Sequence, residues 1–188
     1  DNFYLRLKDS YSVGDRTVED NINAGLSWGN ATTALRYNRV LSKKLFMNVT
    51  GTFSRYNFDI GQGMKSVSTP SDPAIDSDLS FDYKSLISDW SGRIDFDYIP
   101  STNHYIKFGL GDIYHTFVPG INVFKSDFGS EEGIDTTFGA VPVYAHEYFA
   151  FVEDDFKIGS RFKVNLGLHF SGFITPNSQY QSLQPRVS

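Results

Sequence analysis

Three groups of His and carboxylate residues have types that could do chemistry. They are His146 with Glu147, the acidic run Glu153, Asp154 and Asp155, and Asp112 with His115. A carboxylate beside an imidazole can transfer protons or bind a metal ion, but a metal site also requires a recognised spacing of its ligands. None of the three groups has such a spacing, so we expect no metal site. We interpret Glu153 and Asp155 as solvated carboxylates at the end of a strand.

Other signatures of catalysis are missing from the sequence. No nucleophile elbow, phosphate-binding glycine loop or zinc-binding helix occurs, and Gly61-Gln62-Gly63 lacks the flanking strand and helix of a nucleotide-binding turn. The acidic segment 126–135 lacks the ligand pattern of a calcium loop, and we interpret it as a solvated loop. The chain has no cysteine, which excludes thiolate chemistry. We therefore expect a protein that is not an enzyme and that binds no cofactor.

Composition narrows the class of protein further. The chain has 188 residues, of which 17 are Phe and 11 are Tyr, and its formal net charge is −5. An acidic chain without a basic stripe excludes a nucleic-acid partner. No apolar run is long enough for a transmembrane helix, and the first residues lack the pattern of a signal peptide. The many aromatic residues need another explanation.

Apolar and polar residues alternate along most of the chain with a period of two, which is the period of a β-strand. The clearest run places Phe162, Val164, Leu166, Leu168 and Phe170 on one face and Lys163, Asn165, Gly167, His169 and Ser171 on the other. The alternation predicts eight strands, at about residues 2–12, 24–40, 44–60, 80–99, 104–117, 142–156, 161–173 and 181–188. All of them exceed the ~5–6 residues of an average strand, and all but the last are long enough for the ~9–11 residues of a tilted membrane strand.

Short and long connections alternate between these strands. Segments 41–44, 100–103 and 157–160 each join two strands as tight turns, whereas residues 62–79 and 118–140 are long polar stretches. Successive strands of an antiparallel barrel turn at opposite membrane surfaces, with short periplasmic turns and longer extracellular loops. The fold class that we predict is therefore an all-β, antiparallel, up-and-down transmembrane β-barrel.

The two faces of the predicted strands differ as such a barrel requires. A sheet that spans hydrocarbon must close, because every backbone N–H and C=O has to be paired, and its outer face is apolar while its lumen is wet. We expect seven residues to face the lumen: Arg36, Asn38, Arg93, Asp95, Lys107, Asn165 and His169. These charges fit a wide, hydrated barrel better than a narrow one that is filled by its own side chains.

Several strand motifs, in their order along the chain, carry a resemblance to a known family. They are Trp28-Gly29-Asn30, Ala34-Leu35-Arg36-Tyr37-Asn38, Asp95-Phe96-Asp97-Tyr98, His104-Tyr105-Ile106-Lys107-Phe108-Gly109, Val152-Glu153-Asp154-Asp155-Phe156-Lys157 and Ser182-Leu183-Gln184-Pro185-Arg186-Val187-Ser188. With these motifs the chain resembles TonB-dependent receptors of the Bacteroidetes type over almost its whole length. The resemblance implies a barrel of about 22 strands around an N-terminal plug. Residues 1–188 are then a segment of the barrel domain, and the plug and signal peptide lie outside it.

The resemblance also implies a function and partners. The function is import of a scarce nutrient, either an oligosaccharide, a peptide or a metal chelate, across the outer membrane of a Gram-negative bacterium. The implied partners are the TonB complex, through an N-terminal region outside this chain, the lipid bilayer and a surface lipoprotein. We expect residues 62–78 and 118–137 to contact the nutrient or the lipoprotein.

A second hypothesis remains open from the residues alone. A soluble β-sandwich could use the same loops to bind carbohydrate or protein. The two hypotheses differ in what covers the apolar faces of the strands. In a barrel these faces meet lipid, whereas in a sandwich they pack against each other.

Overall fold

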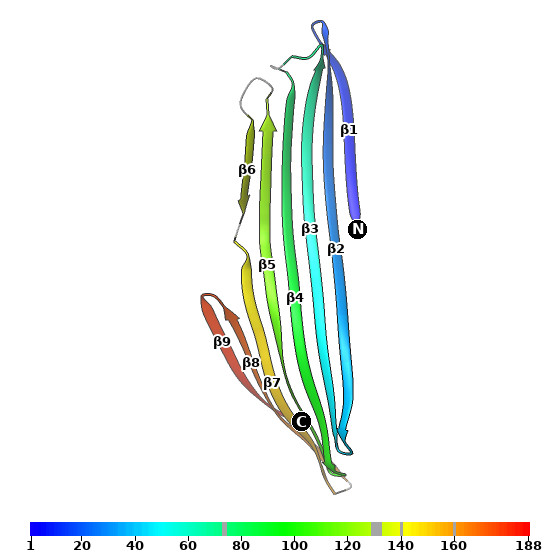
Figure 1. Cartoon of the computed structure of the whole chain (residues 1–188), viewed down its shortest axis with the longest axis vertical. Helices are drawn as coiled ribbons and strands as arrows, with labels where there is room; N and C mark the ends of the chain where they lie inside the picture. Colours follow the sequence, from blue (N-terminus) through cyan, green and yellow to red (C-terminus); the bar gives the residue numbers. More distant parts are fainter. Residues whose placement is uncertain (73–74, 129–132, 140, 160) are drawn as a thin grey trace. The chain divides into compact units, whose positions relative to one another are not determined.

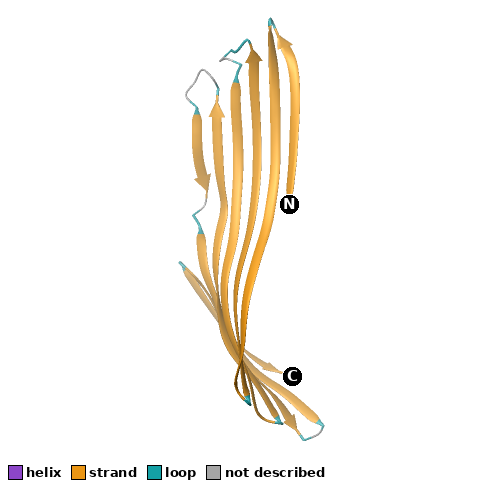
Figure 2. Cartoon of the chain, turned by 45° about the vertical axis from the view of Figure 1, so that its right-hand side comes forward, coloured by secondary structure: helices purple, strands orange, loops and turns teal. Residues whose placement is uncertain are grey.

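The computed structural model describes residues 1–188 apart from 73–74, 129–132, 140 and 160. The described residues form strands and turns without a helix (Figure 2). The strands are β1 (Asn2–Val13), β2 (Arg16–Ser42), β3 (Leu45–Thr69), β4 (Ser77–Ser101), β5 (His104–Asp127), β6 (Ile134–Gly139), β7 (Val143–Ile158), β8 (Phe162–Thr175) and β9 (Ser178–Val187). A search of the same residues for a helix that could cross a bilayer found none.

All the strands belong to one sheet, in the order β1-β2-β3-β4-β5-β7-β8-β9, and β6 pairs with β5 (Figure 1). The predicted all-β, antiparallel, up-and-down arrangement is confirmed. The predicted number of eight strands is wrong, because residues 134–139 form an additional strand and the described part of the chain contains nine. Within that part the sheet does not close: β1 and β9 end the strand order, and β6 pairs with β5 alone.

The central strands are much longer than the alternation predicted. β2, β3, β4 and β5 have 27, 25, 25 and 24 residues. Residues 62–69 and 118–127, which we expected in long loops, belong to β3 and β5. Gly, Ser and Asp weaken strand propensity at these positions, but pairing with neighbouring strands overrides a weak local preference. Of the predicted loops and turns, residues 73–74, the acidic residues Glu131 and Glu132, and Ser160 lie outside the described residues.

The turns do not alternate between short and long as we expected. The predicted tight turns at 41–44 and 100–103 are confirmed. At the other ends of the strands, β1 and β2 are joined through Gly14 and Asp15, and β8 and β9 through Pro176 and Asn177. Gly14 has a φ of 67°, a conformation that glycine adopts without steric cost. Both of these connections have two residues because strand pairing continues to the tips.

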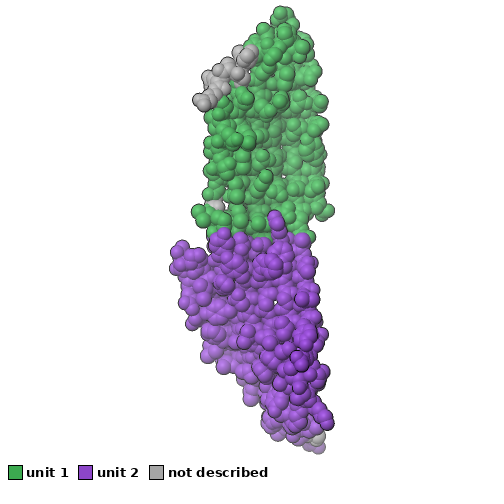
Figure 3. All heavy atoms as spheres, in the orientation of Figure 1, with its two compact units in different colours: residues 1–30, 56–87, 117–142 green, residues 31–55, 88–116, 143–188 purple. Residues whose placement is uncertain are grey.

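The chain divides into two compact units, which we describe separately (Figure 3). Unit 1 contains residues 1–30, 56–87 and 117–142, and unit 2 contains residues 31–55, 88–116 and 143–188. Among the described residues, Val18 and Ala145 are the only buried apolar side chains. A domain normally buries the apolar face of a sheet against a second layer. The described strands form a single layer, so their apolar side chains stay exposed.

Candidate functional site

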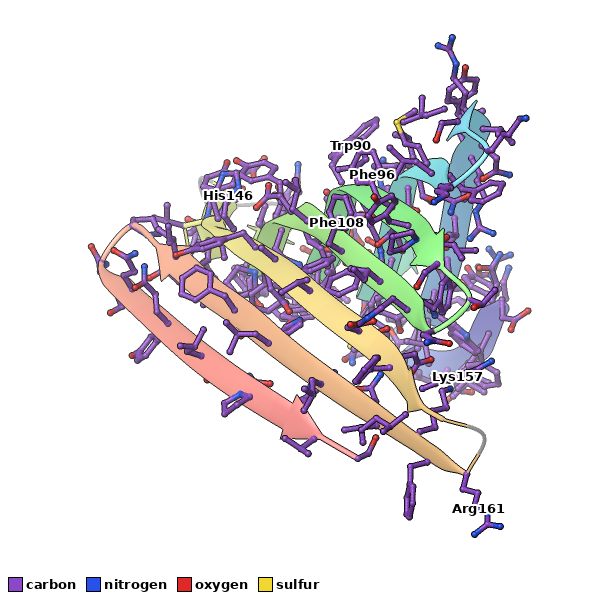
Figure 4. All side chains as sticks on the ribbon, turned by 90° about the horizontal axis from the view of Figure 1, so that it is seen from below. Trp90, Phe96, Phe108, His146, Lys157 and Arg161 are labelled. Atoms are coloured by element: carbon purple, nitrogen blue, oxygen red, sulfur yellow. The ribbon has the colours of Figure 1, made fainter. Side chains whose placement is uncertain are left out.

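Strand register sorts the side chains of unit 2 onto two faces, because directly opposite residues of an antiparallel pair share a face. Ala150 lies opposite Phe170, which in turn lies opposite Leu183. Phe96 stacks on Phe108, with 4.9 Å between the ring centroids (Figure 4). We call this side the apolar face of unit 2; it includes Phe53, Trp90, Phe96, Phe108, Leu110, Ala150, Val152, Leu168, Phe170 and Leu183.

The apolar face of unit 2 is open to solvent in the structure. Trp90, Leu110 and Leu183 are 61%, 58% and 61% exposed. No described residue from another layer covers them. Exposed apolar patches of more than a few hundred Å² are rare on soluble monomers and mark contacts with protein, ligand or membrane.

The opposite side of the same strands, the polar face of unit 2, carries charged residues around a cavity of about 540 Å³. The cavity is lined by Arg93, Asp95, Asp97, Lys107, Phe149, Phe151, Glu153, His169 and Arg186, and also by Phe96, although the Phe96 ring stacks on Phe108 of the apolar face. A second cavity of about 530 Å³ adjoins it and shares Arg93 and Asp95. Its remaining lining residues are Arg36, Asn48, Thr50, Thr52 and Ser91.

The structure brings most of the predicted site residues together. Arg93, Asp95, Lys107 and His169 line the first cavity, and Arg36 lines the second. Two predicted residues line neither of these cavities. Asn165 donates a hydrogen bond to Asp155 at 2.9 Å. Asn38 is an exposed residue of β2, beyond the ladder with β1, which ends near residue 28. Whether these side chains face a lumen stays a prediction.

Two phenylalanine rings form the floor of the first cavity, and the sequence analysis missed them. The ring of Phe151 lies over Gly109, where a Cβ atom would come within 2.9 Å of it. The ring of Phe149 lies over Gly111, where a Cβ atom would come within 2.7 Å. Residues 147–152 are apolar at most positions of both faces, which hid these rings from a search for alternation. The sequence feature that could have revealed the two rings is the pair Gly109 and Gly111 on β5, which leaves room for them on the polar face.

Charged groups around this floor are held by hydrogen bonds. The Nε atom of Arg93 donates to Asp95 Oδ2 at 2.6 Å. Its guanidinium carbon lies 5.5 Å from the centroid of the Phe149 ring and 5.7 Å from that of Phe151, within the range of cation–π attraction. Tyr105 donates its hydroxyl hydrogen to Asp97 at 2.5 Å. The site therefore combines an aromatic floor with fixed charges.

Strand pairing gives the His and carboxylate residues partners that differ from their neighbours in sequence. Asp112 pairs with His146 at 2.9 Å and not with His115. His115 contacts Asp89 at 2.8 Å and Glu147 at 3.5 Å. Asp112 and His115 are three residues apart on β5, so their side chains point to opposite faces. Among the described residues, no group of three or more His, Asp or Glu could bind a metal ion.

His104 and Asp154 form one more pair of this kind, at 2.7 Å, and it lies on the apolar face of unit 2. The ring of His104 also stacks on Phe156, with 4.4 Å between centroids. The pair His104–Asp154 and the pair His146–Asp112 lie at the two ends of the run of apolar residues on β5 and β7. Pairing and stacking reduce the cost of placing polar groups on this face.

Unit 1 distributes its apolar residues differently. On β3, the odd-numbered positions Leu45, Met47 and Val49 are apolar in unit 2, whereas the even-numbered positions Phe58 and Ile60 are apolar in unit 1. At residues 57–65 of β3 the odd-numbered positions hold no apolar side chain, and their contacts include a hydrogen bond from Asn57 to Asp59 and one from Ser27 to Asp59. Apolar residues therefore change face along β3.

The turn between β3 and β4 in unit 1 is organised by Asp76. Its carboxylate accepts hydrogen bonds from the backbone and hydroxyl of Ser68, at 2.6 and 2.7 Å, and from the hydroxyl of Ser71, at 2.6 Å. These bonds lower the pKa of Asp76 to about 2. Arg16 joins the turn to β2 through Asp72, at 3.2 Å. The segment expected to contact a ligand at 62–78 is thus mostly strand, closed by a firmly bonded turn.

The polar face of unit 2 offers donors, acceptors and an aromatic floor within one open cavity, which suits noncovalent binding of a small molecule. No family model matches the chain, and a search of curated proteins found no match. The functional interpretation rests on the residues and their geometry.

Proposed function

We propose that this chain forms part of the wall of a transmembrane β-barrel of the TonB-dependent receptor type, which imports a scarce nutrient across the bacterial outer membrane. One observation carries the proposal: the apolar face of unit 2 is uncovered by any described residue, while the opposite face carries charges around a cavity. Hydrocarbon on the first side and a water-filled lumen on the second would suit both faces at once.

The height of the apolar region on β5 supports a membrane. The paired residues His104 and Asp112 bracket Ile106, Phe108 and Leu110 on the apolar face. The eight residue steps between them, from 104 to 112, correspond to about 27 Å along the strand. At a tilt of roughly 40° this is about 20 Å across the bilayer, close to the ~25 Å apolar band of outer-membrane barrels.

The change of face along β3 supports the same proposal. A strand needs only ~9–11 residues to cross the membrane, whereas β3 has 25. Where a barrel strand projects beyond the bilayer its outer side meets water, so polar residues such as Asn57 and Asp59 fit there.

The remaining parts of the proposal come from the resemblance of the strand motifs. Free sheet edges cannot face lipid, because their backbone groups would lack partners, so further strands must close the barrel. The TonB complex would supply the energy for import, and a surface lipoprotein would be a partner at the outer side. The imported nutrient would be an oligosaccharide, a peptide or a metal chelate.

Spin labels at single cysteines test the orientation of the two faces, since the chain has no cysteine of its own. Labels at Leu110→Cys and Leu183→Cys should collide with oxygen dissolved in the bilayer of reconstituted vesicles. Labels at Thr52→Cys and Ser171→Cys on the polar face should collide with a water-soluble nickel complex instead. If the labels at Leu110→Cys and Leu183→Cys collide with neither reagent, protein covers the apolar face, as the β-sandwich hypothesis requires.

A further inference from the structure

The cavity on the polar face of unit 2 has more unused donors than unused acceptors. Arg93 engages Asp95 through its Nε atom, and its two terminal nitrogens make no hydrogen bond with any described residue. Arg186 lines the cavity and has no ion pair within the described part of the chain. The Nδ1 atom of His169 is buried there and also lacks a partner among these residues.

Two of the three carboxylates of the cavity, Asp95 and Asp97, accept hydrogen bonds from described residues. Asp97 accepts from Tyr105 at 2.5 Å and from Asn48 at 3.4 Å. Glu153 lies 4.0 Å from the ammonium group of Lys107. Asp95 uses Oδ2 for Arg93, so its Oδ1 is the one buried carboxylate oxygen of the described cavity residues that lacks a partner. The free hydrogen-bonding capacity therefore favours a ligand that is rich in acceptors.

The free donors border the aromatic floor. The imidazole of His169 is nearly parallel to the ring of Phe149, at 11°, with 6.0 Å between centroids. Arg186 lies directly opposite Gly167, which has no side chain to separate it from the cavity. The guanidinium group of Arg93 lies above the Phe149 and Phe151 rings. A ligand that reached Arg93 or Arg186 would also contact apolar carbon.

We propose that this cavity binds an organic anion. Its carboxylate or phosphate group accepts hydrogen bonds from Arg93 and Arg186, and its apolar or aromatic part lies against Phe149 and Phe151. A planar guanidinium group binds such anions through two parallel hydrogen bonds. The cavity volume of about 540 Å³ is in the range of small-molecule sites. This assignment specifies the chemical class of the ligand of the proposed receptor. It rests on the proposed function in one respect, that the polar face is the face that meets water.

Calorimetric titration of the purified protein tests the site with four probes. Benzoate and phenyl phosphate carry a ring with an anionic group, inorganic phosphate carries charge without a ring, and benzyl alcohol carries a ring without charge. Benzoate and phenyl phosphate should bind with saturation, inorganic phosphate more weakly, and benzyl alcohol not at all. Whichever of benzoate and phenyl phosphate binds more strongly identifies whether the site prefers a carboxylate or a phosphate.

Substitutions locate the binding. Arg93→Gln and Arg186→Gln should each weaken benzoate binding at least tenfold, which corresponds to about 1.4 kcal/mol. Lys163→Gln is the matched control, because Lys163 is a cation of the same face that pairs with Asp155 at 3.0 Å and lines no part of this cavity. It should leave the affinity unchanged. Two arginine variants are used so that the conclusion does not depend on a single substitution that could displace Phe149 or Phe151.

Three results would overturn the anion site: no saturable binding of either anionic ring, equal binding of benzyl alcohol, or equal losses in the arginine variants and in Lys163→Gln. These results are separable from the membrane proposal. If the label at Leu110→Cys meets lipid while benzoate fails to bind, the barrel wall stands without this site. If benzoate binds while that label is covered by protein, the site stands without the barrel.

Discussion

Placing an arginine on each face of unit 2 gives the sharpest test of the membrane wall. Ala150 is an exposed residue of the apolar face, four residues from both Asp154 and His146. That separation is about 13 Å along the strand and, at a tilt of roughly 40°, about 10 Å in height, which puts Ala150 near the middle of the band. Arginine at the midplane of a barrel destabilises it by ~2–4 kcal/mol. Ala150→Arg should therefore lower the ratio of folded to unfolded protein roughly 30- to 700-fold.

Ser171→Arg is the matched control. Ser171 lies opposite Phe149, and Ala150 lies opposite Phe170, so the two positions are one register step apart and on opposite faces. An arginine at Ser171 would meet water and the nearby carboxylate of Glu147, at a cost of ~0–1 kcal/mol. The assay is equilibrium unfolding by denaturant of protein reconstituted in phospholipid vesicles. Equal costs for the two variants, or a larger cost for Ser171→Arg, would refute the assignment of the faces.

Two more predictions concern single positions. Gly109→Ala should destabilise the protein by about 1–3 kcal/mol, because the new Cβ would lie within 3 Å of the Ile94 carbonyl oxygen, the Asp95 carboxylate and the Phe151 ring, whereas Gly92→Ala, with nothing within 4 Å, should be close to neutral in the same denaturation assay. An equal effect of the two would show that the surroundings of Gly109 are not crowded by these three groups. Asp76 has a pKa of about 2 instead of 3.8, so its hydrogen bonds stabilise the turn above pH 3.8 and are lost as the pH falls through 2. Asp76→Asn should therefore speed amide hydrogen exchange of Ser68 at pH 7, and this difference should shrink as the pH is lowered through that range; a difference independent of pH would contradict it.

Alternation predicted the strands of unit 2 well because one physical rule, opposite faces for neighbouring residues, governs them. It placed Arg93, Asp95 and Lys107 on one side, where the structure brings them to one cavity. It could not predict that Asp112 meets His146, because that contact depends on how β5 and β7 are aligned, and no local pattern encodes the alignment.

The polar stretches were misassigned for a second reason. Residues 62–69 look like a loop because they contain Gly, Ser and Lys. Their strand conformation depends on pairing with a neighbour, which contributes hydrogen bonds whatever the side chains are. Ser66 illustrates the point: its hydroxyl donates to Asp20 of β2 at 2.6 Å, so a residue typical of loops is fixed by a strand distant in sequence.

The change of face along β3 lies inside the predicted strand at 44–60. The period of two continues through residues 45–64, but the apolar positions are odd-numbered up to Phe53 and even-numbered from Tyr56. The prediction ended at residue 60, where the apolar residues give way to Gly61-Gln62-Gly63, although the strand continues to Thr69. In the proposed barrel, the strand keeps its geometry while the medium outside it changes from hydrocarbon to water. A barrel strand that projects from the bilayer should therefore be sought by its period alone, with the apolar face allowed to switch once.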